Sequence, residues 1–211
     1  MENINISGTD TDHLNLLKKA ITGIKSSYNL AINTTPTILK EITIFFTDAK
    51  ISDKSYYFFP KNILQINQKN NFFIIDCFLD FGYFAGSRGV KDNGTSKQIW
   101  GYAKTKEDYG NLLIRPITKA DKLIGRFISP GIKLNTNKEF DNKYYVASNQ
   151  SNVSNYLNKE FIDFAAKCNN LLVYIRKGQL MIGFLEEKIT SNQVLYLCKL
   201  LNSMTFIEAT M

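Results

Sequence analysis

The sequence predicts an α+β fold with a mostly antiparallel sheet and helices packed on one side of it. Three observations support this class. Apolar residues near the N-terminus recur at helical spacing, the middle of the chain holds β-branched and aromatic runs, and the last third follows the order strand, helix, hairpin, helix. We expect one domain over 1–211, with 1–36 as an N-terminal helical segment.

The first predicted element is a helix over about residues 11–32. Its apolar side recurs every three or four residues, at Leu14, Leu17, Ile21, Ile24 and Tyr28. Pro36 ends this segment, because a proline pushes the preceding residue out of the helical region.

From Thr37 onward the sequence predicts strands. ILKEITIFFTDAKI has mixed character, and its β-branched and aromatic EITIFF core favours a strand. The further predicted strands are SYYFF, ILQIN, NFFIIDCFLDFGYF, QIWGYAKT, GNLLIRPI and KYYVASN. Pro60-Lys61-Asn62 separates the first two of these, and Pro116 suits the edge or end of its strand.

The glycine-rich stretch after the longest strand is predicted to be a hairpin connection. A phosphate-binding loop requires glycines at fixed offsets and a following helix, whereas here an aromatic strand follows. Asn93-Gly94 is a strong turn signal. We therefore expect Ala85–Lys97 to be an exposed connection between antiparallel strands Phe72–Phe84 and Gln98–Lys104.

The C-terminal third is predicted to contain a helix, a hairpin and a closing helix. The helix spans 151–168, with Ser151 or Asn152 as its cap. Its predicted apolar side consists of Val153, Tyr156, Leu157, Phe161, Phe164, Ala165 and Cys168. The hairpin Leu171–Phe184 turns at Arg176–Gln179, where Gly178 allows positive φ. SNQVLYLCKLLNSM then forms the C-terminal helix packed on the sheet.

The cysteines predict buried free thiols in a reducing compartment. Cys77, Cys168 and Cys198 are odd in number, far apart and set in apolar segments. The N-terminus has no apolar secretory core, and no apolar stretch is long enough to span a membrane. These features predict a soluble, cytoplasmic protein without a bound metal.

The sequence offers no motif that predicts an enzyme or a cofactor. Asp76 and Asp80 share one face of a strand, and Glu186 with Lys188 could complete a nuclease-like metal site, but solvated charges at strand ends explain them better. His13 is the only histidine, and neither a G-x-S-x-G motif nor a cysteine–histidine pair is evident.

The positive charge of the chain is concentrated in its middle. The net charge is +7, and the interval Arg88–Lys143 holds twelve lysines and arginines against six acidic residues. Such a region could meet an acidic partner, nucleic acid or an anionic membrane surface, although a solvated face explains the charge more simply. The predicted partner-binding residues are Arg88, Lys91, Lys97, Lys119, Lys122 and Arg126.

The order of segments resembles that of uncharacterised bacterial α+β domain families. The resemblance covers roughly residues 56–185, from IIDCFLDFGYFAGSRG through GNLLIRPI to the closing FDNKYYVASNQSNVSNYLNKEFIDFAAK and LLVYIRKGQLMIGF. Asp76 corresponds to the strand aspartate of those families and Gly86-Ser87 to their turn, while Cys77 replaces the tyrosine that follows the aspartate there. The resemblance implies the fold class and no activity.

The function predicted from sequence is that of a non-enzymatic interaction or adaptor module that binds a protein partner, alone or within a larger assembly. The alternative is a nucleic-acid-associated protein that uses the basic region 88–143. Aromatic residues are plentiful in the neighbouring strands, and base stacking would need them exposed on a basic sheet face.

Overall fold

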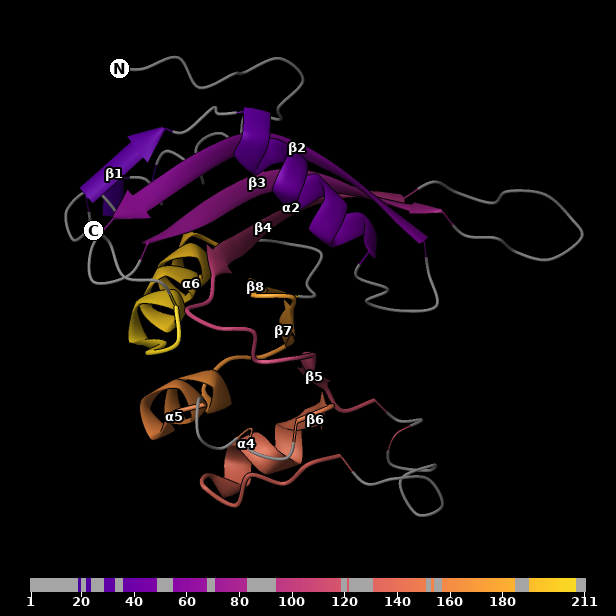
Figure 1. Cartoon of the computed structure of the whole chain (residues 1–211), viewed down its shortest axis with the longest axis vertical. Coiled ribbons are helices and arrows are strands. Elements are labelled where there is room, and N and C mark those ends of the chain that lie inside the picture. Colours follow the sequence, from indigo (N-terminus) through magenta and orange to yellow (C-terminus); the bar gives the residue numbers. More distant parts are fainter. Residues whose placement is uncertain are drawn as a thin grey trace, which may run out of the picture.

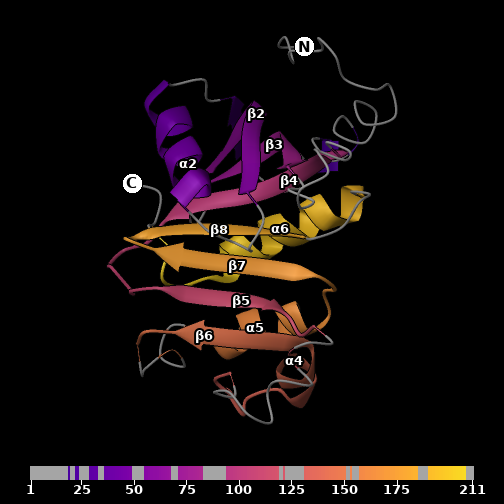
Figure 2. The same cartoon turned by 90° about the vertical axis from the view of Figure 1, so that its right-hand side faces the viewer.

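A computed structural model shows one eight-stranded sheet in the order β1-β2-β3-β4-β8-β7-β5-β6, with every neighbouring pair antiparallel (Figures 1 and 2). The structure describes residues 19, 22–23, 29–32, 36–48, 55–67, 71–82, 94–118, 121, 131–150, 153, 157–184 and 190–207. The predicted α+β class with a mostly antiparallel sheet is confirmed.

The elements follow one another along most of the chain. The strands are β1 (Asn29–Ile32), β2 (Ser55–Asn67), β3 (Asn71–Gly82), β4 (Gly94–Lys104), β5 (Leu112–Pro116), β6 (Tyr144–Ser148), β7 (Leu171–Arg176) and β8 (Gln179–Phe184). The helices with described bounds are α2 (Pro36–Asp48), α4 (Lys138–Lys143), α5 (Lys159–Ala166) and α6 (Ser191–Ser203).

Strands β2, β3 and β4 form an arm that extends past the rest of the sheet (Figure 1). Only Trp100–Lys104 of β4 pairs with β8, so the beginning of β4 continues the arm alone with β3. The two strands predicted on either side of Pro60 are one strand, β2, whose register with β3 shifts between Pro60 and Asn62. A bulge accommodates a proline in a long strand.

Strands β5, β6, β7 and β8 form the compact half of the sheet. The predicted β7–β8 hairpin is confirmed: its two central residues, Lys177 and Gly178, have φ of 50° and 72°. Positive φ at both central residues is the turn geometry that matches the twist of paired strands. Pro116 is the last residue of β5, as predicted.

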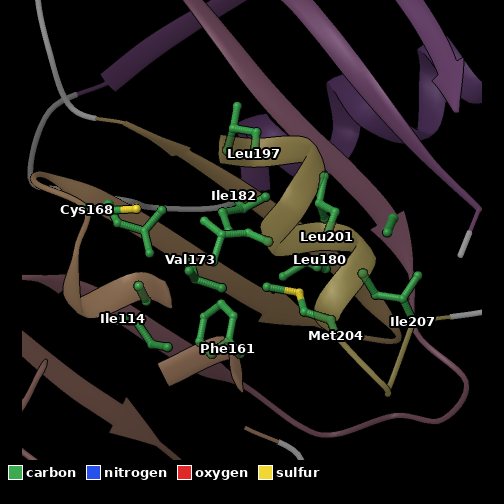
Figure 3. Close-up of a cluster of buried hydrophobic side chains, with 14 of the residues drawn as sticks. Ile114, Phe161, Cys168, Val173, Leu180, Ile182, Leu197, Leu201, Met204 and Ile207 are labelled. Carbon is green, nitrogen blue, oxygen red and sulfur yellow. The ribbon is translucent and has the colours of Figure 1, made fainter. Parts of the chain in front are cut away.

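Side chains alternate between two cores, one on each face of the sheet. The larger core joins α4, α5 and α6 to side chains such as Ile114, Val173 and Ile182 (Figure 3). The smaller core joins Ile42 and Phe45 of α2 to the opposite face. The prediction that all helices pack on one side is therefore wrong: α2 lies on the other face.

Helix α2 replaces the strand predicted after Thr37. Ile38, Ile42 and Phe45 recur at helical spacing and pack on the sheet, and this tertiary packing outweighs the β propensity of EITIFF. Pro36 is the first residue of the helix, where its missing N–H costs no hydrogen bond. The proline therefore starts a helix as well as separating it from the segment before.

The predicted N-terminal helix lies mostly outside the described residues. Residues 19, 22 and 23 are helical, which agrees with the prediction. Asn29–Ile32, however, form strand β1 paired with β2, so the predicted end of the helix at about residue 32 is wrong.

The helix predicted over 151–168 is shorter. α5 begins at Lys159 because the side chain of Asn158 accepts a hydrogen bond from the backbone N–H of Phe161 at 2.7 Å. Its buried side chains are Phe161, Ile162, Ala165 and Ala166, whereas Phe164, expected in the core, is half-buried. The C-terminal helix α6 is confirmed and starts with a capping box between Thr190 and Gln193.

The connection predicted over Ala85–Lys97 is partly strand. β4 already begins at Gly94 and pairs with the end of β3, which confirms the antiparallel hairpin but shortens its connection. Residues 83–93 lie outside the described part of the chain.

Candidate interaction surface

The face of the sheet opposite α5 and α6 is covered unevenly. α2 covers the half over β2, β3 and β4 and also reaches β7, since the ring of Phe45 lies 6.4 Å from that of Tyr102 and 5.5 Å from that of Tyr174. The half over β7, β5 and β6 faces the viewer in Figure 2, and none of the helices with described bounds lies in front of it. We take this half as the candidate surface.

Six half-buried side chains make up this surface, which we call the tyrosine–arginine face: Leu113, Arg115, Tyr145, Ala147, Tyr174 and Arg176. The strand register brings them together. Leu113 lies opposite both Ala147 and Tyr174, and Arg115 lies opposite Tyr145. Because directly paired residues project to the same side of a sheet, as do residues two apart along a strand, all six share one face.

The centre of the face is an arginine held in one position. The two terminal nitrogens of Arg115 donate to the two carboxylate oxygens of Asp121 at 2.6 and 2.7 Å. The guanidinium carbon lies 4.6 Å from the centre of the Tyr145 ring, a cation–π contact. A bidentate pair of this kind fixes the orientation of the guanidinium group as well as its charge.

Asp121 also binds Thr118, which lies two residues after the end of β5. Its Oδ2 accepts hydrogen bonds from the backbone N–H and the hydroxyl of Thr118, both at 2.7 Å, and its own N–H donates to that hydroxyl at 3.1 Å. The bonds from Arg115, and then those from Thr118, hold the pKa of Asp121 well below its ordinary value. The same ion pair raises the pKa of Arg115.

The predicted partner-binding residues fall almost entirely outside the described residues. Arg88, Lys91, Lys119, Lys122 and Arg126 all do so, and Lys97 lies in β4. In the sequence, Lys119 follows Thr118 and Lys122 follows Asp121, and Thr118 and Asp121 are hydrogen-bonded to each other.

The basic region contributes many of its described charges to the fold itself. The side chains with partners are Lys104 with Glu41, Lys106 with the carbonyl of Thr205, Arg115 with Asp121, Lys133 with the carbonyl of Asp141, and Lys143 with Glu139. Charges that are paired within the fold are less available to an external anion. Asp121 and Glu139 are already among the six acidic residues counted in this interval, and Glu41 is the one acidic partner in this set that lies outside it. The pairing therefore holds these side chains in place and lowers the counted excess by one charge.

The three cysteines are free and buried, as predicted. Burial raises the pKa of Cys168 to about 11 and that of Cys198 to about 12. A thiol with so high a pKa is almost entirely protonated near neutral pH, and only the thiolate is a good nucleophile. These cysteines therefore pack as small apolar residues.

Only part of the metal site considered from sequence lies within the described residues. Asp76 and Asp80 lie in β3, while Glu186, Lys188 and His13 lie outside the described residues. Within the part of the chain that the structure describes, no group of three or more His, Cys, Asp or Glu side chains is placed to hold a metal ion.

The tyrosine–arginine face was missed from sequence, although two signals for it exist. In the predicted strands, Arg115, Tyr145 and Tyr174 alternate with buried apolar residues, which assigns them to the opposite face. Thr118-Lys119-Ala120-Asp121 also has the spacing of a capping box. What the sequence does not reveal is the strand order, in which β6 and β7 lie on the two sides of β5.

Comparison of the chain with protein-family models, with curated proteins and with solved structures found no significant match. The resemblance noted from sequence thus rests on its quoted motifs alone. None of the described helices combines the length and apolarity needed to cross a bilayer.

Proposed function

We propose that this protein is a non-enzymatic cytoplasmic interaction module that binds a protein partner through the tyrosine–arginine face. The composition of that face carries the proposal. Two tyrosines and two arginines stand beside leucine and alanine, with no lysine, aspartate or glutamate among the six. Tyrosine and arginine are enriched where protein interfaces gain most of their binding energy, whereas lysine and acidic residues are depleted there.

Pre-organisation of the face supports the same proposal. Arg115 already has its orientation fixed by Asp121 and by the Tyr145 ring, and Tyr174 packs against Phe45 of α2. Ordering a free arginine on binding costs about 0.5–1.5 kcal/mol per side chain. Much of that cost is absent when the side chain is ordered before the partner arrives.

A protein partner fits this face better than nucleic acid does. Binding to phosphates needs unpaired cations, and base stacking needs free ring faces. The charge of Arg115 is matched by Asp121, and its guanidinium group covers one side of the Tyr145 ring. The nucleic-acid alternative therefore depends on Lys119, Lys122 and Arg126 rather than on this face.

Site-specific photo-crosslinking tests the proposal. Tyr145 is replaced by a photoreactive phenylalanine in cells of the natural host, and Tyr196 of α6, exposed on the opposite side of the sheet, is replaced in the same way as a matched control. We expect a discrete protein adduct from position 145, resistant to nuclease, and a weaker one or none from position 196. Equal adducts at both positions, or an adduct removed by nuclease, would contradict the proposal.

The salt dependence of oligonucleotide binding tests the nucleic-acid alternative. If the basic region binds nucleic acid, affinity for a single-stranded oligonucleotide falls steeply with salt, because each neutralised phosphate releases counterions. Replacing Lys119, Lys122 and Arg126 with alanine would then flatten that slope. We expect no measurable binding in about 50 mM salt, where such contacts are strong. Tight binding under those conditions would favour the nucleic-acid function.

A further inference from the structure

A pocket of about 500 Å³ lies where the end of β5 meets the α4–β6 junction and the connection from α5 to β7. Its lining residues are Pro116, Ile117, Asn142, Lys143, Tyr144, Cys168, Asn169 and Asn170. The volume is in the range of pockets that hold small ligands. None of the six residues of the tyrosine–arginine face lines this pocket.

Two adjacent side chains hold the carbonyls that follow α5. The ammonium of Lys143 donates to the carbonyl oxygen of Ala166 at 2.6 Å, and the hydroxyl of Tyr144 donates to that of Cys168 at 2.8 Å. Tyr144 and Cys168 are buried, and burial raises the pKa of Tyr144 above its ordinary value. These bonds satisfy the end of the helix and make this wall of the pocket rigid.

Three asparagine side chains are free to meet a ligand. Asn142, Asn169 and Asn170 are exposed, and no hydrogen bond joins their side chains to another residue in the described part of the chain. Asn170 has a φ of 54°, a left-handed conformation that asparagine tolerates better than most residues. Each amide offers a donor and an acceptor close together.

The charges around the pocket disfavour ionic ligands of either sign. Among the described residues that line the pocket, Lys143 alone is charged, and its ammonium is already bound to Glu139 at 2.8 Å as well as to Ala166. An anion thus meets no surplus positive charge, and the nearby C-terminal end of α5 carries partial negative charge. A cation, in turn, meets no carboxylate among the described residues that line the pocket.

We propose that this pocket binds a neutral carboxamide group. A carboxamide presents the same adjacent donor and acceptor as an asparagine side chain, so the two can form a pair of hydrogen bonds in one plane. A hydroxyl group carries its donor and its acceptors on one oxygen atom, so it cannot form that pair of parallel bonds. The group can belong to a small molecule or to a glutamine or asparagine side chain of another protein, and the pocket recognises the chemistry common to both.

The first test compares isosteric probes by nuclear magnetic resonance of the ¹⁵N-labelled protein. Propionamide, propionate, propylammonium and 1-propanol are titrated separately, and the amide signals of Asn142, Asn169 and Asn170 are followed. We expect saturable shifts with propionamide and at least about tenfold weaker binding for the other three, a difference of about 1.4 kcal/mol. Equal or stronger shifts with any of the others, or shifts with propionamide that never saturate, would overturn the proposal.

The second test uses matched variants. Asn142→Leu combined with Asn169→Leu should abolish saturable binding of propionamide, whereas Asn192→Leu, at an exposed asparagine of α6, should leave it unchanged. Because all three positions are exposed, the variants should keep the wild-type spectrum elsewhere. Retained binding in the double variant, or equal loss in the control, would contradict the assignment.

Two further probes distinguish the source of the carboxamide. A glutamine residue capped at both ends by amide groups represents a protein side chain, and free glutamine represents a small molecule. Tighter binding of the capped form assigns the pocket to a protein segment, and tighter binding of free glutamine assigns it to a small molecule. If neither form binds more tightly than capped glutamate, the carboxamide assignment is wrong.

Discussion

Trp100 and Gly183 show how one residue pair fixes the centre of the sheet. The two are directly paired across β4 and β8, and a Cβ atom added to Gly183 would lie 2.5 Å from ring atoms of the indole. Trp100 is only 1% exposed, so its ring cannot move into solvent to make room. The glycine is therefore required by packing and not by its backbone angles.

We predict that Gly183→Ala destabilises the fold by about 1–3 kcal/mol, the usual cost of overpacking a core. Gly23→Ala is the control: the nearest atom to a Cβ added there is a methyl of Leu195 at 3.4 Å, an ordinary van der Waals contact, so we expect little cost. Urea denaturation followed by the fluorescence of Trp100, the only tryptophan, would measure both changes. A cost at Gly23 as large as that at Gly183 would contradict this account.

Asp121 links the tyrosine–arginine face to the pH dependence of stability. Its pKa is lowered in the folded protein, so the ion pair with Arg115 contributes stability that is fully present above the unfolded pKa of about 4. That contribution is lost as the pH falls below this value toward the folded pKa.

Comparison of the wild type with Asp121→Asn should reveal this contribution. We predict that the asparagine variant is less stable at about pH 6 and that the difference in unfolding free energy shrinks at about pH 3.5. Urea denaturation at the two pH values measures it, and Glu160→Gln serves as a control at an exposed acid of α5 that has no ion pair with another described residue. A difference that does not change with pH would show that the ion pair adds no stability.

At the scale of elements, sequence patterns predicted what depends on local signals and failed where tertiary packing decides. The β7–β8 hairpin and α6 have strong turn and capping signals, and both were placed correctly. α2 was predicted as a strand because its residues favour both structures, and contact with the sheet selects the helix. α4 has six residues and too little periodicity to be recognised, although Asn137 caps it.

The candidate surface was beyond prediction for a related reason. Arg115 and Tyr145 lie in segments correctly predicted as strands, yet 29 intervening residues hide their pairing. The count of charges along the sequence pointed instead to lysines and arginines of the basic region. It could not show that Lys104, Lys143 and Arg115 are paired within the fold.

Helix α5 offers a direct test of which side chains form its core face. Phe161 is 0% exposed, whereas Phe164 is half-buried and meets Tyr196 edge-on, with ring centres 5.6 Å apart. We predict that Phe161→Ala costs about 3–5 kcal/mol, as expected for a fully buried phenylalanine. Phe164→Ala should cost less, because it buries less area. Its cost should include about 0.5–1.5 kcal/mol for the lost aromatic contact with Tyr196. Chemical denaturation of both variants would measure the difference, and equal costs would contradict the assignment of faces.

At the scale of the whole molecule, the two cores are built on the same strands. Trp100 and Tyr102 of β4 enter the smaller core, while Ile99 and Ala103 of the same strand enter the larger one. Register pairs also form one continuous row across the sheet: Ala31, Gln65, Phe73, Tyr102, Met181, Tyr174, Leu113 and Ala147. Neither core can open fully without disturbing β4 and β8, which the other core needs.

The cysteines allow this coupling to be measured, because they are divided between the cores. Cys77 belongs to the smaller core, and Cys168 and Cys198 belong to the larger one. All three are at most 6% exposed, so a thiol reagent reaches them only when the surrounding structure opens. We predict that native protein reacts slowly and that all three thiols become reactive over the same range of urea concentration, as in a two-state transition. Mass spectrometry after pulse labelling would resolve the three sites. Labelling of Cys77 well before the other two would show that α2 and the arm of β2–β4 open as a separate unit, and the shared strands would then not couple the two faces.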